Sequence, residues 1–290
     1  MFTRADAVPN ANGRLWKVEK SGIPASYLFG TFHSGEALNT ITPEIWDLLE
    51  GSRIAIFEVE LAEQDAMEAR MAADPSFAFD LTGPGTLSLL TDEQIETFDK
   101  ALSQRGIGIE AADRMQPWLL AAILSFPACH LRAMSAGETP LDTVMANRAN
   151  ALGIEEAGLE SYEAALDGLR RVPTETLIKA LIGVPELMDM DEDLFRTNHE
   201  FYETGRIQAI NELSIYLSER FQPELDAAAI NSEMMVELLD VRNRSWMPRL
   251  TKEVTRGGAF VGVGALHLPG ELGLIELLRA EGFTVTRMDG

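Results

Sequence analysis

The last part of the chain constrains the fold most strongly, because it has the pattern of a strand, a helix and a second strand. Residues 259–263 form an unbroken apolar run, which is typical of a short buried strand. Residues 272–280 then repeat apolar side chains at helical spacing, Gly282 ends that segment, and residues 283–288 again have strand character. Such a unit normally connects two parallel strands, so we predict an α/β fold.

The other strand candidates lie near the amino terminus and in the middle of the chain. Residues 14–19 and 26–32 have strand character, and the segment 21–24 between them contains Gly and Pro, which is typical of a hairpin turn. Residues 53–61 and the short segment 154–158 are further candidates. We therefore expect one small mixed β-sheet, of the α/β or α+β type, built from both chain ends and a central strand.

Two long helical stretches separate these strands. Helical periodicity dominates from about residue 62 to 152 and again from about 162 to 256. We predict a single domain over residues 1–290, in which the two stretches are large helical insertions. They would cover an edge of the sheet or form a lid.

The composition excludes several kinds of partner. The chain has 46 acidic and 24 basic residues and a formal net charge of -22, which argues against binding to nucleic acid or to an anionic membrane. The same charge keeps a protein soluble, and it would also suit a cationic peptide partner. Cys129 is the only cysteine, so an internal disulfide or a thiolate metal cluster is excluded.

The sequence gives no sign of a membrane segment or a leader. No apolar run approaches the length of a membrane span, and residues 1–6 lack the apolar core of a secretory leader. We therefore expect a cytoplasmic protein without a transmembrane segment, or a periplasmic or extracellular one if a leader has been removed.

Two of the four histidines follow a Gly-x-x pattern at the end of a predicted strand. His33 follows Gly30 in this way, and His267 follows Gly264. Because sites in open α/β sheets form at the carboxyl ends of the strands, we expect the two imidazoles to meet there. Neutral imidazole is a common metal ligand and an acid or base near neutral pH. One such histidine alone is more often bonded to nearby backbone, but the repeated pattern favours a site.

Three glutamates are candidates for the same site. Glu58 and Glu60 alternate with apolar residues, so period two places both carboxylates on one face of the predicted strand 53–61. A carboxylate in an apolar strand is costly unless it is paired or coordinating, so Glu58 is the first candidate for a metal ligand or general base. Glu60 has the alternative of reaching water beyond the strand end. Glu160 follows the strand 154–158, and its alternative is a place in the first turn of the next helix.

The remaining polar candidates are less specific. Arg242 and Asn243, on a predicted helix, would bond site carboxylates or a substrate oxyanion, although spacing alone favours a solvated ion pair for the arginine. His130 and His199 lack the Gly-x-x context, and we predict structural roles for them. The sequence has no Lys-Ser/Thr phosphate loop, no His-Glu-x-x-His and no Gly-x-Ser-x-Gly, which argues against a P-loop NTPase and a serine hydrolase.

Taken in order, these segments resemble the TraB/GumN family, which includes the TIKI metalloproteases. The resemblance is carried by two Gly-x-x-His segments, an acidic strand, an Arg-Asn helix and a Gly-Leu-Glu element, namely residues 27–33, 260–268, 56–60, 241–246 and 158–160. The set extends from about Leu15 to Met288, essentially the whole chain.

The resemblance implies a fold similar to the erythromycin-esterase and ChaN-like proteins. It implies His33, His267 and Glu58 as catalytic residues and metal ligands, with Mn or Co as the divalent ion; nitrogen and oxygen donors are also compatible with Zn or Fe. Residues that would contact the substrate or support the ligands are Glu60, Glu160, Arg242, Asn243, Gly30 and Gly264.

Three functional hypotheses follow. The first is a metal-dependent hydrolase, a peptidase acting on short peptides or protein N-termini, because two His and one carboxylate leave open positions on an ion that activates water. The second is a binding protein that sequesters a peptide without cutting it, since the family also includes proteins linked to shutting down peptide pheromones. The third is a metal-independent, esterase-like hydrolase in which a histidine and Glu58 activate water directly.

Overall fold

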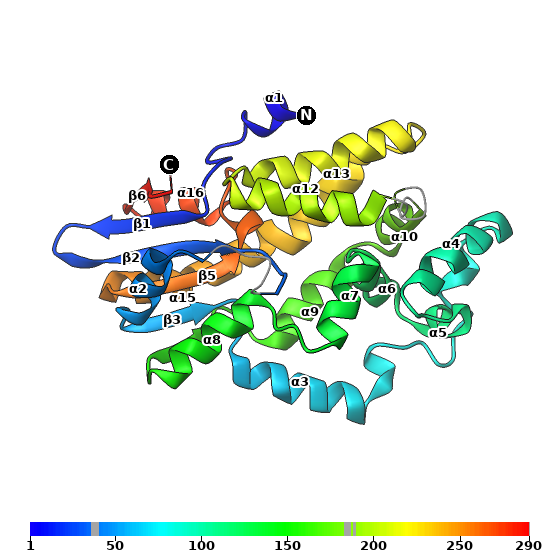
Figure 1. The fold of residues 1–290 in the computed structure, drawn as a ribbon, viewed down its shortest axis with the longest axis horizontal. Helices are drawn as coiled ribbons and strands as arrows, with labels where there is room; N and C mark the ends of the chain where they lie inside the picture. The colour runs from blue at the N-terminus through cyan, green and yellow to red at the C-terminus, as the bar shows by residue number, and fades with distance from the viewer. Residues whose placement is uncertain (36–40, 183–186, 188–189, 290) are drawn as a thin grey trace.

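The computed structural model describes residues 1–35, 41–182, 187 and 190–289. Figure 1 shows the sheet at one end of the molecule and most of the helices gathered at the other. Six strands form one mixed sheet in the order β4-β3-β5-β2-β1-β6. Strands β2 to β5 are parallel, and β1 pairs antiparallel with both β2 and β6.

The strands come from both ends of the chain and from its middle. Their bounds are β1 Leu15–Lys20, β2 Ile23–Thr31, β3 Ile54–Phe57, β4 Glu155–Gly158, β5 Ala259–Gly264 and β6 Thr284–Arg287. The predicted mixed sheet and α/β class are therefore confirmed. The hairpin turn is also confirmed, because Lys20 pairs with Ile23 and Gly22 takes a φ of 77°, which suits glycine.

The helices fill the two stretches expected from the sequence. Between β3 and β4 lie α3 Leu61–Ala73, α4 Asp92–Gln104, α5 Ile109–Arg114, α6 Pro117–Leu124, α7 Ala128–Ser135 and α8 Leu141–Ala151. Between β4 and β5 lie α9 Tyr162–Arg171, α10 Thr174–Ile182, α12 Asp191–Glu203, α13 Ile207–Phe221, α14 Ala227–Met235, the π-helical η5 Val236–Asp240 and α15 Val241–Arg256. The shorter connections hold α2 Pro43–Glu50, η6 Ala265–His267 and α16 Leu274–Ala280, with α1 Phe2–Ala5 before the sheet.

Within the described residues, no single helix is long and apolar enough to cross a membrane. Helices α6 and α7 meet that length and composition only as a pair, and a bend of 94° separates them.

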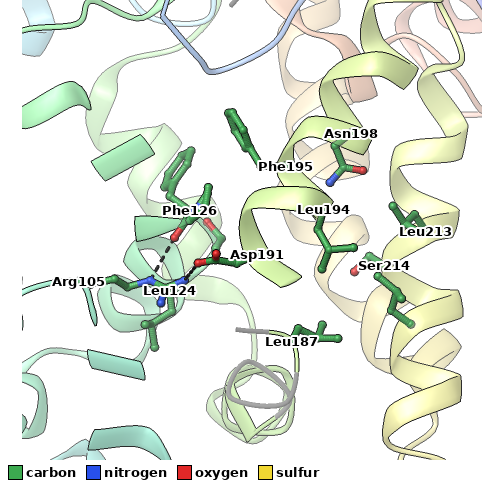
Figure 2. Close-up of a pocket in the computed structure, with 13 residues that line it drawn as sticks. Arg105, Leu124, Phe126, Leu187, Asp191, Leu194, Phe195, Asn198, Leu213 and Ser214 are labelled. Carbon is green, nitrogen blue, oxygen red and sulfur yellow. Dashed lines mark hydrogen bonds and ion pairs between the residues drawn. The ribbon is translucent and has the colours of Figure 1, made fainter. Parts of the chain in front are cut away.

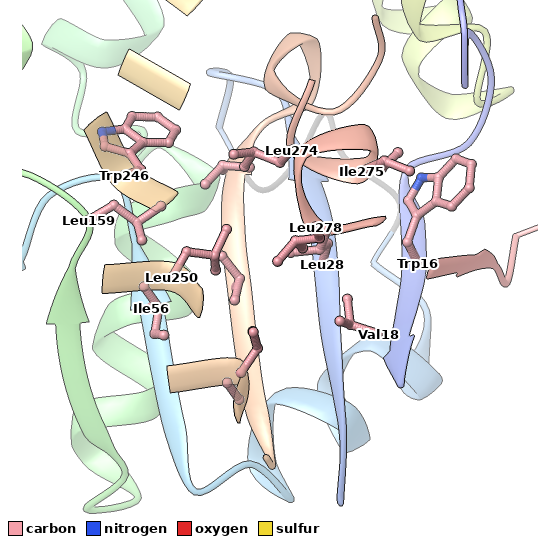
Figure 3. Close-up of a cluster of buried hydrophobic side chains, with 14 of the residues drawn as sticks. Trp16, Val18, Leu28, Ile56, Leu159, Trp246, Leu250, Leu274, Ile275 and Leu278 are labelled. Atoms are coloured by element: carbon pink, nitrogen blue, oxygen red, sulfur yellow. The ribbon is translucent and has the colours of Figure 1, made fainter. Parts of the chain in front are cut away.

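Helices cover both faces of the sheet, which explains why its strands are apolar on both sides. On one face α15 and α16 bury a cluster shown in Figure 3, which includes Trp16, Leu28, Ile56, Trp246, Leu250, Leu274 and Leu278. On the other face α2 and α8 bury a second cluster, which includes Phe29, Phe57, Phe260, Leu49 and Met145. The central strand β5 is buried along its whole length. The segment that follows it, η6, is therefore held in the middle of the sheet's carboxyl edge.

Two details differ from the sequence-based expectation. Strand β3 ends at Phe57, so the prediction that Glu58 and Glu60 lie within a strand of period two is wrong. The pairing of β3 with β4 ends at Phe57 and Gly158, and beyond it the chain turns into α3. The strand–helix–strand unit at the carboxyl terminus connects β5 and β6, which run in the same direction. The two strands are not neighbours, however, because β2 and β1 lie between them in the sheet.

Candidate functional site

Polar side chains gather where four neighbouring strands end at the same edge of the sheet. His33 follows β2, Glu58 follows β3, Glu160 follows β4 and His267 follows β5. Helix α15 passes over this edge and adds Arg242 and Asn243. The fold therefore brings together most of the candidates from the sequence, because parallel strands share a carboxyl edge.

Arg242 lies at the centre of an ion-pair network. Its Nη2 donates to Glu58 Oε2 at 2.5 Å and lies 2.6 Å from Glu160 Oε1, which also accepts from Nε at 2.8 Å. Its Nη1 donates to the Leu238 carbonyl at 3.2 Å and lies 3.3 Å from His267 Nε2. A guanidinium has five N–H donors, so these partners engage all of them. Arg242 is thereby fixed within the protein.

The prediction of a solvated ion pair for Arg242 is wrong. Its side chain is only 13% exposed, and that of Glu160 only 7%. The guanidinium stacks 4.8 Å from the ring centre of Trp246, one turn further along α15. Glu160 lies before the N-cap of α9, Ser161, and its carboxylate is directed to Arg242. Packing of α15 over the sheet edge is what excludes water from this pair.

His267 is buried and held in one tautomer. Its Nδ1 lies 2.7 Å from Asn243 Oδ1. The Asn243 amide cannot flip without loss, because its Nδ2 donates to the carbonyls of His267 and Leu272 at 3.2 and 2.9 Å. Nδ1 must therefore carry the proton, and the Nε2 lone pair faces Arg242 Nη1 within the site. Burial, with the positive charges of Arg242 and His33, lowers the pKa of His267 to about 3, so the ring is neutral.

His33 is more open and has a charged partner that the sequence analysis missed. Its Nδ1 lies 3.2 Å from Asp142 Oδ2, and Asp142 Oδ1 accepts from the Thr31 hydroxyl at 2.5 Å. The hydrogen bond and charge of Asp142, with the charge of Glu58, raise the pKa of His33 to about 9. Because the side chain is 58% exposed, water screens these charges, and we expect the pKa between its ordinary 6.5 and that value.

The segment before α8 holds the His33 loop in place. The Leu141 N–H donates to the Ser34 carbonyl at 3.0 Å, and Gly35 forms an isolated antiparallel bridge with Pro140. Asp142 lies in the first turn of α8, where an acidic residue is common because of the helix dipole. That ordinary pattern gave no reason to connect it with a histidine 109 residues away.

Gly264 forms the floor on which the site residues converge. Its N–H donates to Glu58 Oε1 at 2.8 Å. A Cβ at this position would lie 3.2 Å from Glu58 Oε1, 3.3 Å from His33 Nε2 and 3.6 Å from His267 Cδ2. A side chain here would thus enter the space that these three groups share.

Gly30, the matching glycine of the first motif, has a different role. A Cβ there would come within 2.9 Å of the backbone and side chain of Ala265, so the glycine allows β2 to pack closely against η6. Glu60 also lies apart from the centre. Its side chain accepts from the Gly158 N–H and from Arg249, each at 3.2 Å, and is 37% exposed, in agreement with the alternative that it reaches water.

Glu58 remains ionised. Burial acts to raise its pKa, but the positive charges of Arg242 and His33 and the hydrogen bond from the Gly264 N–H lower the pKa well below its usual range. An anionic carboxylate of such low pKa is a weak general base and a good partner for a positive charge. The position and charge of Glu58 therefore favour a role as a metal ligand or as an electrostatic partner of a positive charge.

The donors suit a divalent ion in type and direction. His267 Nε2 lies 3.7 Å from Glu58 Oε1, and His33 Nε2 faces the same Gly264 floor. Each imidazole is anchored through Nδ1 by an oxygen acceptor, as is usual for metal-ligating histidines. As they stand, no three His, Cys, Asp or Glu side chains among the described residues are grouped closely enough to hold an ion. Arg242 donates to the second Glu58 oxygen and lies 3.3 Å from His267 Nε2, so the donor types suit an ion, but an ion would have to displace the guanidinium from this nitrogen.

A cavity of about 540 Å³ opens beside these residues. It is lined by His33, Glu58 and Asp142 together with apolar side chains, including Phe57, Leu61, Met134 and Tyr162. This size is within the usual range for small-ligand sites. A separate cavity of about 180 Å³ between the α6–α7 turn, α12 and α13, shown in Figure 2, contains none of the candidate residues.

The fold and the site define an α/β protein with a buried histidine–glutamate–arginine cluster at the carboxyl edge of a mostly parallel sheet. Residues 14–287 match the sequence model of the TraB/PrgY/gumN family, and the chain belongs to this family. The resemblance inferred from the motifs is thereby confirmed. A search of curated proteins gives no significant match to the chain.

Proposed function

We propose that this protein is a metal-dependent hydrolase that cleaves short peptides or the N-termini of proteins. The observation that carries the proposal is the convergence of two imidazoles, each anchored through Nδ1, and the Glu58 carboxylate on the floor formed by Gly264. His33, His267 and Glu58 would hold a divalent ion, with Mn or Co expected first. Peptides are proposed because of the family, and the neighbouring cavity is large enough for a peptide side chain and its backbone.

The protein's own groups prepare this site for chemistry. When bound, a divalent ion would polarise the scissile carbonyl and lower the pKa of the attacking water. Asn243 keeps His267 neutral with Nε2 directed to the site, and Asp142 orients His33. The Gly264 N–H and Arg242 fix the two oxygens of Glu58. Ligands held in this way need little reorganisation during the reaction.

The first test is metal binding. Protein without a His-tag is stripped with chelator and titrated with Mn²⁺ and Co²⁺ by calorimetry. We expect His33→Ala and His267→Ala each to weaken affinity at least ~100-fold, since loss of a supporting group alone often costs about 10- to 100-fold. His199→Ala is the matched control, because His199 is half-buried in α12 and outside the site. Equal affinity in all four proteins would remove the ligand assignment.

The second test is turnover. A peptide library is incubated with the Mn- and Co-loaded protein, and the products are analysed by mass spectrometry. Fragments that disappear after chelator treatment and in Glu58→Gln support the proposal. Peptides that are retained by the protein and recovered intact would instead support the sequestering role.

Metal-independent hydrolysis is the second candidate, because one observation favours it. Arg242 already places a positive charge on Glu58, and the Asp142–His33 pair has the geometry of an oriented acid or base with Nε2 facing the site. This candidate predicts turnover of esters or peptides that persists in chelator and is lost in His33→Ala.

A further inference from the structure

Two buried carboxylates converge on a single nitrogen of Arg242. Glu58 Oε2 lies 2.5 Å and Glu160 Oε1 lies 2.6 Å from its Nη2. The other terminal nitrogen, Nη1, lies 3.3 Å from the unprotonated Nε2 of His267. Carboxylate oxygens and a neutral imidazole are also the donors that divalent ions take. The guanidinium is therefore held by the groups that would hold an ion.

The charges of this cluster do not balance. Its two carboxylates carry two negative charges, Arg242 carries one positive charge, and His267 is neutral. The positive charge of His33 is shared with its own partner, Asp142. Both carboxylates of the cluster are largely buried, so water compensates little of the remaining charge. A divalent cation would neutralise both carboxylates, whereas the guanidinium neutralises one.

The acceptors are also held by groups other than the arginine. The second oxygen of Glu58, Oε1, accepts from the Gly264 N–H at 2.8 Å. His267 is held through Nδ1, which lies 2.7 Å from Asn243 Oδ1. Because neither contact involves the guanidinium, these two acceptors keep their orientation if the guanidinium moves away.

We propose that Arg242 is an internal competitor of the divalent ion, and that its guanidinium leaves the two carboxylates and His267 when the ion binds. This exchange rests on the metal site proposed above and adds Glu160 to the groups that hold the ion. The arginine must also give up its bond to the Leu238 carbonyl and its stacking on Trp246. The affinity of the wild-type protein for the ion is therefore lower than its acceptors alone would give.

The first experiment is calorimetric titration of chelator-stripped, full-length protein without a His-tag with Mn²⁺. Arg242→Met keeps an apolar stem but removes the charge and the donors, and we expect it to bind Mn²⁺ at least ~10-fold more tightly than the wild type. A purely supporting role of the arginine predicts the opposite direction, because loss of a supporting group weakens a metal site. Unchanged or weaker binding by this variant would overturn the proposal and leave the metal site itself in place.

Arg249→Met is the matched control, because it removes the same charge from an exposed position of the same helix. Its affinity for Mn²⁺ should stay within ~2-fold of the wild type, since water and salt screen an exposed charge. A gain equal to that of Arg242→Met would show that net charge alone raises the affinity, and would overturn the exchange.

A measurement on the wild-type protein decides the question even if Arg242→Met fails to fold. The Nε–H of Arg242 donates to Glu160 Oε1 at 2.8 Å, and its NMR signal is assigned by through-bond correlation. On saturation with Zn²⁺, which is diamagnetic and suits the same donors, we expect this signal to move to the position of a solvent-exposed arginine. The Nε–H of Arg53, bonded to the Gly257 carbonyl at the opposite edge of the sheet, is the internal reference and should not move.

The outcomes separate this exchange from the proposed function. Saturable binding of Zn²⁺ with an unmoved Arg242 signal would overturn the exchange alone. No binding of Mn²⁺ or Zn²⁺ by the wild-type protein at millimolar concentration would overturn both the exchange and the proposed metal site.

Discussion

His33 and His267 follow the same Gly-x-x pattern at the ends of neighbouring parallel strands, yet their surroundings differ in almost every respect. His267 is 3% exposed, bonded to an amide and neutral, and it belongs to what we call the closed half of the site, with Glu58, Glu160, Arg242 and Asn243. His33 is largely exposed, bonded to a carboxylate and shifted toward the charged form, and with Thr31 and Asp142 it forms the open half.

The difference teaches that the motif fixes where a histidine lies but not its protonation state. The strand end sets the position, and the partner of Nδ1 sets the charge. For His267 the partner is 24 residues upstream on α15, and for His33 it is 109 residues downstream on α8. The closed half is a rigid, desolvated platform, whereas the open half faces the cavity of about 540 Å³.

The largest effect on stability is expected from the closed half. Arg242→Gln leaves Glu58 and Glu160 buried next to each other without a cation, and loss of one partner of a buried ion pair typically costs about 3–5 kcal/mol. Urea unfolding measures this loss. Arg249→Gln is the control on the same helix, since its pair with Glu60 is 46% and 37% exposed and should contribute at most about 1 kcal/mol. Equal losses in the two variants would show that burial of the Arg242 network adds nothing to its contribution, and the closed half would not be a desolvated platform.

The next effect concerns Asn243, which makes three hydrogen bonds at a position 1% exposed to solvent. Asn243→Ala leaves His267 Nδ1 and two carbonyls without partners, which costs about 1–3 kcal/mol for an unsatisfied buried group. It also releases the tautomer of His267, so metal affinity should fall about 10- to 100-fold. Calorimetry and unfolding on the same preparations measure both. A loss of stability with unchanged metal affinity would mean that the amide has no influence on the ligand.

His33→Ala should separate function from stability. The side chain is 58% exposed and its ion pair is screened by water, so we expect a change in unfolding free energy below about 1 kcal/mol. Turnover should nevertheless be lost, because Nε2 faces the Gly264 floor. A strong loss of stability would show that the open half is as integral to the fold as the closed half.

Structural features that depend on a short stretch of residues could be predicted from the sequence. Apolar runs ending in glycine located the strands around His33 and His267, and the shared carboxyl edge then predicted that these residues meet. The burial of Arg242 was not predictable, because its partner Glu58 is 184 residues away and only the packing of α15 excludes water from the pair. Asp142 was missed for the same reason, since an acidic residue in a first helical turn is ordinary in itself.

The smallest expected effect tests the charge of the open half directly. Asp142→Asn keeps an acceptor for His33 Nδ1 but removes the negative charge, so the pKa of His33 should fall toward its ordinary value of 6.5. In the wild type the folded-state pKa of His33 is raised, so the pair of charged His33 with Asp142 stabilises the folded protein. This contribution is complete below about pH 6.5 and is lost as the pH rises through the folded-state pKa, which is at most about 9. The stability difference between wild type and variant should therefore be larger at pH 6 than at pH 9.

NMR titration of the ring protons in metal-free protein measures the pKa itself, with His199 as internal reference. An unchanged pKa in the variant would show that Asp142 holds the ring in place without setting its charge, and the contrast between the two histidines would then rest on burial alone.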